Sequence, residues 1–180
     1  MILFLTGYRG SGKTLIGRLT AQRLGCPWLD ADALIEQSSG RTVAGIFEER
    51  GEAGFRQFEE QAIQATVERA GPAGSVPRLV FSLGGGAVLN PRVRESLAAS
   101  GKCVWLRADP EILIDRLSRT VGNRQRPPLT EQSLDGEVRT LLARREPVYA
   151  ECADYEIDTG RCTPEEAADR IAQWVGQVDK

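Results

Sequence analysis

Residues 7–14 read GYRGSGKT and match every fixed position of the phosphate-binding loop pattern G-x-x-x-x-G-K-[S/T]. The glycines at positions 7, 10 and 12 let the backbone turn tightly and bring its N–H groups close to phosphate oxygens. The Lys13 ammonium is expected against the β- and γ-phosphates of a nucleotide, and the Thr14 hydroxyl is suited to ligate Mg²⁺. This stretch therefore predicts a nucleotide-binding loop.

The sequence on either side supplies the context that such a loop needs. Residues 2–5 (ILFL) are wholly apolar, as is typical of a buried parallel strand. Downstream, Leu15, Ile16, Leu19 and Leu24 recur at roughly helical spacing, so a helix is expected to begin in the loop. The N-terminus of that helix would add its dipole to the anion site. A glycine turn that matched the pattern by chance would lack this order of strand, loop and helix.

The whole chain has the size and charge of one domain without a strongly charged partner. Its 180 residues, 1–180, are expected to form a single domain, and 23 basic against 25 acidic residues give a formal net charge of −2. We therefore expect neither nucleic acid nor a membrane as a partner, and no apolar run is long enough to span a bilayer. The four cysteines are scattered, which suits a reducing cytosol, and the absence of histidine excludes a His-dependent triad.

Strand and helix patterns alternate along the chain. Such alternation predicts an α/β fold with a parallel sheet of about five strands covered on both faces. The polar stretch at about 120–133 is too long for a tight turn and is interpreted as a mobile lid. The expected strands are 3–6, 28–30, 79–83, 103–106 and 155–159, and the expected helices are 13–24, 33–38, 43–50, 54–69, 92–99, 110–119, 134–149 and 164–178.

Two aspartates follow the second expected strand. If Asp30 and Asp32 both lie on the end of that strand, its alternation points them to the same side, toward the crevice at the carboxyl ends of the sheet. Asp30 would then hold Mg²⁺ through water, and Asp32 would accept a hydrogen bond from a substrate hydroxyl. The alternative is that either aspartate only caps the next helix.

Arginines and glycines further along the chain predict an acceptor site. Arg56 and Glu59 stand at i, i+3 on one helical face, as a structural ion pair or as a braced guanidinium that grips a carboxylate. Three consecutive glycines (Gly84, Gly85 and Gly86) follow an apolar strand, which favours close approach of a ligand over a plain turn.

Two further arginines are candidates for charge on the substrate and on the transition state. Arg126 stands in the expected lid and Arg145 on the helix that follows it. Either arginine, taken alone, is equally compatible with a solvated surface charge.

Taken together, these motifs resemble the shikimate kinase family. The motifs that carry the resemblance are the GYRGSGKT loop, LDAD at 29–32, GFRQFE at 54–59, GGG at 84–86, Arg-Pro at 126–127 and RREPVY at 144–149. They span nearly the whole chain in family order. The resemblance implies a three-layer α/β/α P-loop kinase fold with a five-stranded parallel sheet, a lid and a substrate-binding region at about 32–60. It also implies a cytoplasmic monomer that transfers the γ-phosphate of ATP to the 3-hydroxyl of shikimate.

The same resemblance implies roles for individual residues, one Mg²⁺ per site among them. Catalysis would rest on Lys13, Asp32 and Arg126, and the metal on Thr14 and, through water, Asp30. Shikimate would contact Asp32, Arg56, Gly84, Gly85, Gly86 and Arg145, with Glu59 bracing Arg56. ATP would contact Gly10, Ser11, Gly12, Lys13, Thr14, Leu15 and Arg126, with Arg119, Arg161 and Pro164 on the adenine side.

One departure from the family pattern and two alternative functions stand beside this interpretation. The lid reads RPPL at 126–129, where the family commonly has leucine directly after the first proline. A gluconate-type or nucleoside-monophosphate kinase would share the fold but need a different acceptor site. A nucleotide-binding regulatory protein without transfer activity would have no use for a lid arginine.

Overall fold

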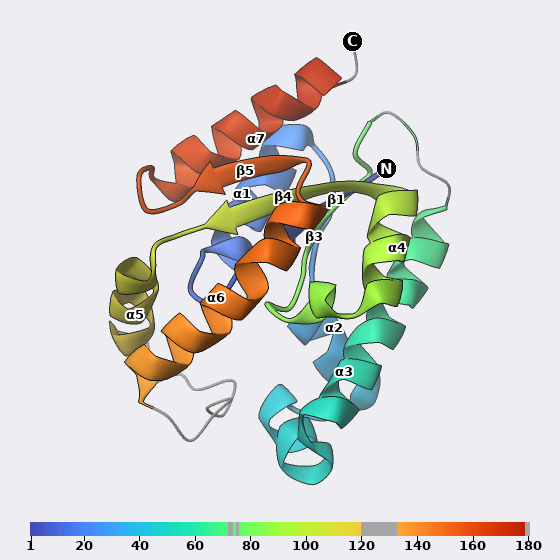
Figure 1. Ribbon diagram of the computed structural model, residues 1–180. Coiled ribbons are helices and arrows are strands. Elements are labelled where there is room, and N and C mark those ends of the chain that lie inside the picture. The colour runs from blue at the N-terminus through green and yellow to red at the C-terminus, as the bar shows by residue number, and fades with distance from the viewer. Residues whose placement is uncertain (72–73, 75, 120–132, 179–180) are drawn as a thin grey trace.

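The computed structural model describes residues 1–71, 74, 76–119 and 133–178, and within them five parallel strands form one sheet (Figure 1). The strands are β1 (Ile2–Thr6), β2 (Trp28–Asp30), β3 (Leu79–Ser82), β4 (Gly101–Arg107) and β5 (Tyr155–Asp158). Their order across the sheet is β2-β3-β1-β4-β5, and every pair is parallel. The predicted parallel α/β fold is confirmed.

Helices cover both faces of the sheet, as parallel pairing requires. In Figure 1, α6 and α4 pass in front of the strands, and α1 and α7 lie behind them. The helices are α1 (Lys13–Leu24), α2 (Ala31–Ser39), α3 (Val43–Ala70), α4 (Pro91–Ser100), α5 (Pro110–Arg119), α6 (Leu134–Cys152) and α7 (Pro164–Val178), with a 3₁₀ turn at η1 (Ala87–Leu89).

The strands are apolar because alternate side chains enter two separate cores. Phe4 of β1 and Phe81 of β3 pack in the core on the α4 and α6 side, with their ring centroids 6.2 Å apart. Their neighbours Leu5 and Val80 point to the other face, into the core against α1 and α7. Both cores exclude water from the central strands, which leaves their carboxyl ends as the accessible edge.

The expected helices at 43–50 and 54–69 form the single helix α3, which is kinked. Gly51 has φ 65° and ψ −174° within it, a backbone conformation that glycine adopts without the strain of a Cβ. The kink separates the first two turns, which contain Val43 and Ile46, from the long C-terminal part that carries Arg56 and Glu59.

The strand order creates a switch point for a ligand. β1 lies between β3 and β4, so the chain leaves β1 toward one side of the sheet and returns to the other. Ligands of open α/β sheets bind at the carboxyl ends of the strands near such a point. The loop after β1 is the GYRGSGKT stretch, and the triple glycine follows β3 beside it. None of the helices described is long and apolar enough to cross a membrane.

Candidate active site

The GYRGSGKT loop connects β1 to α1 as a tight, left-handed glycine turn. Gly7, Gly10 and Gly12 have φ of 140°, 82° and 95°, values that the other residue types rarely adopt. Gly12 is the N-cap of α1 and provides no side-chain cap, so the helix N-terminus presents backbone amides to a ligand. The Lys13 ammonium lies across the loop and donates to the carbonyls of Gly7 (2.7 Å) and Tyr8 (2.9 Å).

Asp30 lies beside this loop, at the end of β2. One of its carboxylate oxygens, Oδ2, accepts a hydrogen bond from the Thr14 hydroxyl at 3.0 Å. The other, Oδ1, accepts from the Asp32 amide at 3.0 Å and so caps α2. Burial, followed by the nearby charge of Asp32, raises the pKa of Asp30. Asp30 therefore caps α2 and also contacts the phosphate-binding loop through Thr14, so its role as a cap does not exclude a role in the site.

The expected placement of Asp32 on the strand is wrong. β2 ends at Asp30, and Asp32 stands in the first turn of α2. The capping bond from Asp30 turns the chain into the helix one residue after the strand. The two aspartates are thus close because of a helix start, not because of strand alternation.

Arg56 is held by two carboxylates on its own helix. Its Nη1 donates to Glu59 Oε2 at 2.6 Å and its Nη2 to Glu52 Oε1 at 2.7 Å. Burial alone lowers the pKa of Arg56, but the two carboxylates outweigh it and raise the pKa, so the guanidinium stays charged. The i, i+3 pair with Glu59 was predicted. Glu52 was missed, although its i, i+4 spacing to Arg56 was a readable signal.

The triple glycine packs against the guanidinium of Arg56 and against the phosphate-binding loop. A Cβ built on Gly86 would lie 2.2 Å from Arg56 Nη2, and one on Gly85 would lie 3.2 Å from the Gly7 carbonyl oxygen. A side chain at Gly86 would displace the Arg56 guanidinium, and one at Gly85 would crowd the backbone of the phosphate-binding loop. The glycines therefore bring the acceptor-side arginine and the phosphate loop together, whereas the sequence argument had assigned the close approach to a ligand.

Arg145 reaches the same glycine turn from α6. Its Nη1 donates to the Gly85 carbonyl at 3.3 Å, and the guanidinium lies 5.5 Å from the Tyr8 ring centroid. The Tyr149 hydroxyl donates to the same carbonyl, and burial raises the pKa of Tyr149 to about 12. Arg145 is 6% exposed and Tyr149 is fully buried, so the two side chains hold the turn from the interior. The alternative of a solvated surface charge is wrong for Arg145.

A partly buried ion pair joins the phosphate loop to α6. Arg9 donates through Nη2 to Glu137, whose side chain is 2% exposed. This pair could not be predicted from the sequence because the two residues are far apart in the chain. It fixes the first turn of α6 directly beside the loop.

Arg9→Met takes a positive charge away from the buried Glu137 carboxylate, so we expect it to destabilise the chain by about 3 kcal/mol. Chemical denaturation measures this as the free energy of unfolding. The matched control is Arg41→Met, which breaks an exposed pair with Glu49 and should cost under about 1 kcal/mol. Equal losses in the two variants would contradict a structural role for the Arg9–Glu137 pair.

The adenine-side candidates lie at the surface. Arg119 pairs with Asp115 on its own helix at 2.9 Å, and Arg161, with a side chain 82% exposed, pairs with Asp158 at 3.3 Å. Pro164 is the first residue of α7. Arg126 and residues 120–132 of the expected lid at about 120–133 fall outside the described residues.

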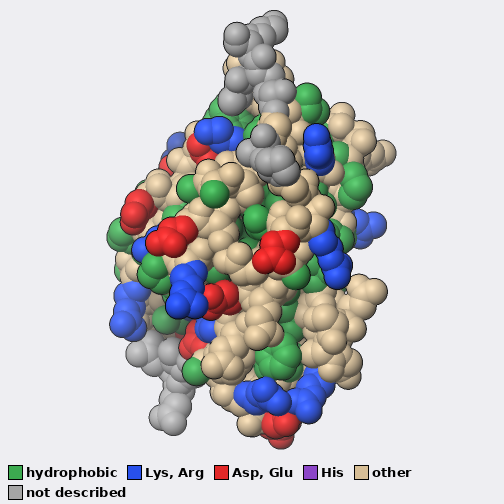
Figure 2. Space-filling model, turned by 90° about the vertical axis from the view of Figure 1, so that its right-hand side faces the viewer, with side chains coloured by type: hydrophobic (Ala, Val, Ile, Leu, Met, Phe, Trp, Pro, Cys, Tyr) green, Lys and Arg blue, Asp and Glu red, His purple; other side chains and the backbone are tan. Residues whose placement is uncertain are grey.

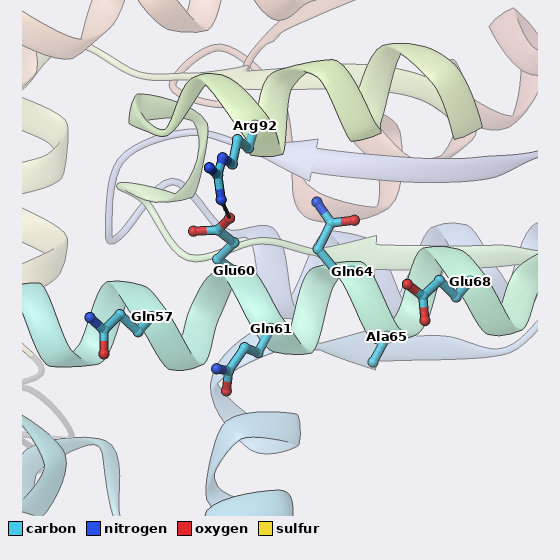
Figure 3. A pocket seen from close by; sticks show the side chains of 7 residues that line it. All are labelled: Gln57, Glu60, Gln61, Gln64, Ala65, Glu68 and Arg92. Carbon is cyan, nitrogen blue, oxygen red and sulfur yellow. Dashed lines mark ion pairs between the residues drawn. The ribbon is translucent and has the colours of Figure 1, made fainter.

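A surface hollow elsewhere on the molecule is separate from this site. It has a volume of about 450 Å³ and lies between α3 and α4, where Arg92 faces Glu60 at 3.7 Å (Figure 3). Its α3 side chains, such as Gln57, Gln61 and Gln64, are polar. Neither the phosphate loop nor the triple glycine lines it.

Comparisons with known proteins agree with one another. A family model described as "Shikimate kinase" matches residues 9–176. A shikimate kinase of Rhodopirellula baltica is 40% identical over 98% of this chain and 94% of its own length. One of Symbiobacterium thermophilum is 44% identical over 89% and 88%. The structure titled "Shikimate kinase from Acinetobacter baumannii in complex with shikimate" superposes with a TM-score of 0.86 at 35% identity, over 98% of this chain and 93% of that chain.

Proposed function

The chain belongs to the shikimate kinase family and is an ATP-dependent phosphotransferase, and from this premise we propose how its own residues divide the work. The acceptor is shikimate, whose 3-hydroxyl oxygen attacks the γ-phosphorus of ATP as ADP leaves. The observation that carries the proposal is the packing of Arg56 and Arg145 on one glycine turn, which itself touches the phosphate loop. Two guanidiniums beside a phosphate loop suit a substrate with a carboxylate on one side and hydroxyls on the other.

The phosphates of ATP bind along residues 10–15. Backbone amides at the start of α1 donate hydrogen bonds to the phosphate oxygens, as at other helix N-termini. Lys13 exchanges its bonds to the Gly7 and Tyr8 carbonyls for phosphate oxygens, so a charge is already in place for the transition state.

The residues beside the loop fit Mg²⁺. The Thr14 hydroxyl and the Asp30 carboxylate, 3.0 Å apart, are oxygen donors of the kind that this ion prefers. Mg²⁺ keeps several waters and binds nucleotide phosphates, so it needs few protein ligands, and within the described residues no cluster of three or more acidic, Cys or His side chains is found. The bound ion would neutralise charge on the phosphates. Thr14 would hold it directly and Asp30 through water.

Asp32 serves mainly to orient the acceptor hydroxyl. Phosphoryl transfer through a loose transition state needs little base strength, so positioning matters more than proton removal. We expect Asp32→Asn to lower kcat by about tenfold, roughly 1.4 kcal/mol of barrier. Steady-state kinetics at saturating ATP and shikimate measures this. A loss of about a thousandfold or more would instead make Asp32 an essential base.

The remaining assignments complete the nucleotide site. Arg126 closes over the phosphates from the lid. Arg119, Arg161 and Pro164 line the adenine, so that the connection after β5 and the first residue of α7, residues 159–164 together, form a base-side loop. The division into a core, a substrate-binding region at about 32–60 and a lid at about 120–133 belongs to the same proposal.

We also propose that the chain works as a cytoplasmic monomer. Among the described residues, the large exposed hydrophobic side chains are the scattered Leu15, Val76 and Leu89, which form no docking patch. Figure 2 shows one face on which positive and negative side chains are interspersed. Cys26, Cys103, Cys152 and Cys162 are free thiols, which suits a reducing compartment.

The direct test is ADP release in a coupled assay with Mg-ATP, with and without shikimate, and with gluconate and AMP as alternative acceptors. Turnover that requires both shikimate and Mg²⁺ supports the proposal. Turnover with gluconate or AMP in place of shikimate would assign the acceptor site to another kinase. ATP binding without turnover on any acceptor would favour the regulatory alternative.

A further inference from the structure

Arg116 joins two loops that the proposed function places at opposite ends of ATP. It stands on α5, and its guanidinium donates hydrogen bonds to both loops. Nη1 donates to the Gly10 carbonyl at 3.2 Å and to the Thr159 hydroxyl at 3.1 Å. Nη2 donates to the Thr159 carbonyl at 2.7 Å. One planar group thus spans from the phosphate loop to the base-side loop.

Each end of this bridge is a fixed point of its own loop. The Gly10 carbonyl belongs to the same peptide as the Ser11 amide, which donates to the Tyr8 carbonyl at 3.2 Å and closes the turn. Thr159 is 3% exposed and is tied to β4, because both its amide (2.8 Å) and its hydroxyl (3.0 Å) donate to the Arg107 carbonyl. Arg116 therefore sets the separation of two rigid segments rather than of two loose ones.

Apolar side chains of α5 also contact the same two loops. A Cβ built on Gly10 would lie 3.3 Å from Leu117 Cγ, and one built on Gly160 would lie 2.3 Å from Ile112 Cδ1. The helix thus touches the phosphate loop at one position and the base-side loop at another, with Arg116 between them.

We propose that Arg116 is a positioning residue for ATP, which holds the phosphate loop and the base-side loop at the separation that one nucleotide spans. The proposal rests on the assignment of residues 159–164 to the adenine side. A nucleotide links a phosphate part and a base part covalently. Once one part is bound, the other binds its own subsite more tightly, but only where the two subsites are correctly spaced. A change in this spacing lowers the affinity for the whole nucleotide, while the phosphate part and the base part, taken separately, still bind their own subsites.

Lysine cannot replace this arginine, although it keeps the positive charge. The planar guanidinium presents its donors in a fixed fork that reaches three acceptors in two loops, whereas an ammonium on a flexible chain is a point charge. Arg116→Lys thus preserves the electrostatic attraction for phosphates and removes the spacing. The matched control is Arg139→Lys. Arg139 also contacts α5, through Glu111 at 2.9 Å, but ties it to α6 rather than to the two loops.

The experiment measures the dissociation constants of ADP, pyrophosphate and adenosine for the unmodified chain, Arg116→Lys and Arg139→Lys. We expect Arg116→Lys to raise the dissociation constant of ADP by about tenfold. The dissociation constants of pyrophosphate and adenosine and the KM for shikimate should change by under about twofold. Arg139→Lys should leave all four values unchanged. Intact pyrophosphate binding shows that the variant keeps its phosphate loop. If Arg116→Lys loses pyrophosphate binding, Thr159→Val serves as the second variant. It removes the bond from Arg116 to the Thr159 hydroxyl, together with the bond from that hydroxyl to the Arg107 carbonyl, and leaves the Gly10 contact in place. It should weaken ADP binding by about threefold.

Three results would overturn the inference in distinguishable ways. Unchanged ADP affinity in Arg116→Lys would make the residue a structural tie alone. Equal weakening of ADP and pyrophosphate would place the damage in the phosphate loop rather than in the spacing. If the unmodified chain bound ADP and pyrophosphate with equal affinity, the assignment of residues 159–164 to the adenine, on which the inference rests, would be wrong. The proposed function would still be supported by shikimate-dependent turnover.

Discussion

Replacing Lys13 by methionine is expected to lower kcat by about 10²–10³-fold, the largest effect of any single substitution in the site. Methionine keeps the length of the side chain and removes the ammonium that would face the β- and γ-phosphates. The transition state for phosphoryl transfer carries spread negative charge, and its stabilisation comes mainly from fixed positive groups. The loss should therefore persist at saturating ATP and shikimate.

The same substitution tests a second role of Lys13. Its ammonium donates hydrogen bonds to the Gly7 and Tyr8 carbonyls, so its loss also leaves these two acceptors to be hydrogen-bonded by water. We expect the melting temperature to fall modestly, in line with about 1–3 kcal/mol for bonds to a charged group. Measuring kcat and the melting temperature on one sample separates the two roles. A fall in kcat of under about tenfold, with the fold intact, would contradict the catalytic role.

Replacing Arg56 by lysine is expected to raise the KM for shikimate by about 10–100-fold while the KM for ATP changes by under about twofold. Lysine keeps one charge near Glu59 and Glu52 but loses the fork that can bond two carboxylate oxygens together. The effect should be confined to the acceptor because Arg56 meets the glycine turn, with Gly86 at its Nη2.

Arg50→Lys is the matched control for this prediction. Arg50 stands on the same helix, with its guanidinium 5.4 Å from the Phe58 ring centroid, and is exposed. Both KM values should stay near those of the unmodified chain. If Arg56→Lys raised the two KM values equally, the damage would lie in the shared fold, and the carboxylate assignment for Arg56 would be wrong.

The parts of the fold that follow from local pattern were predictable from the sequence. The phosphate loop is defined by residue types at fixed spacing, and its flanking strand and helix by apolar periodicity. The Gly51 kink separates the two expected helices of α3 because glycine there takes a positive φ. Strand ends differed by a few residues, since the last residues of a strand depend on pairing with neighbours rather than on their own sequence.

The contacts that assemble the site were not predictable, because they join residues far apart in the chain. Nothing local to Arg9 points to Glu137, and nothing local to Arg116 points to Gly10 and Thr159. Asp32 was misplaced because the capping bond of Asp30 starts a helix where strand alternation had been extended. The triple glycine was recognised as a place of close approach, but its protein neighbours, Arg56 and the phosphate loop, could not be predicted from the sequence. Close approach of a ligand to the same turn stays a prediction.

The measurement that tests the central claim most directly compares kcat/KM for shikimate with that for its methyl ester. The claim is that Arg56 and Arg145, packed on the glycine turn beside the phosphate loop, hold the substrate carboxylate. The account predicts that the ester loses about 100-fold or more in the unmodified chain, and that the difference shrinks to about tenfold in Arg56→Lys. If the ester were turned over as efficiently as the acid, the claim would be wrong, because the carboxylate charge that the ester lacks would then contribute nothing to binding by the two arginines.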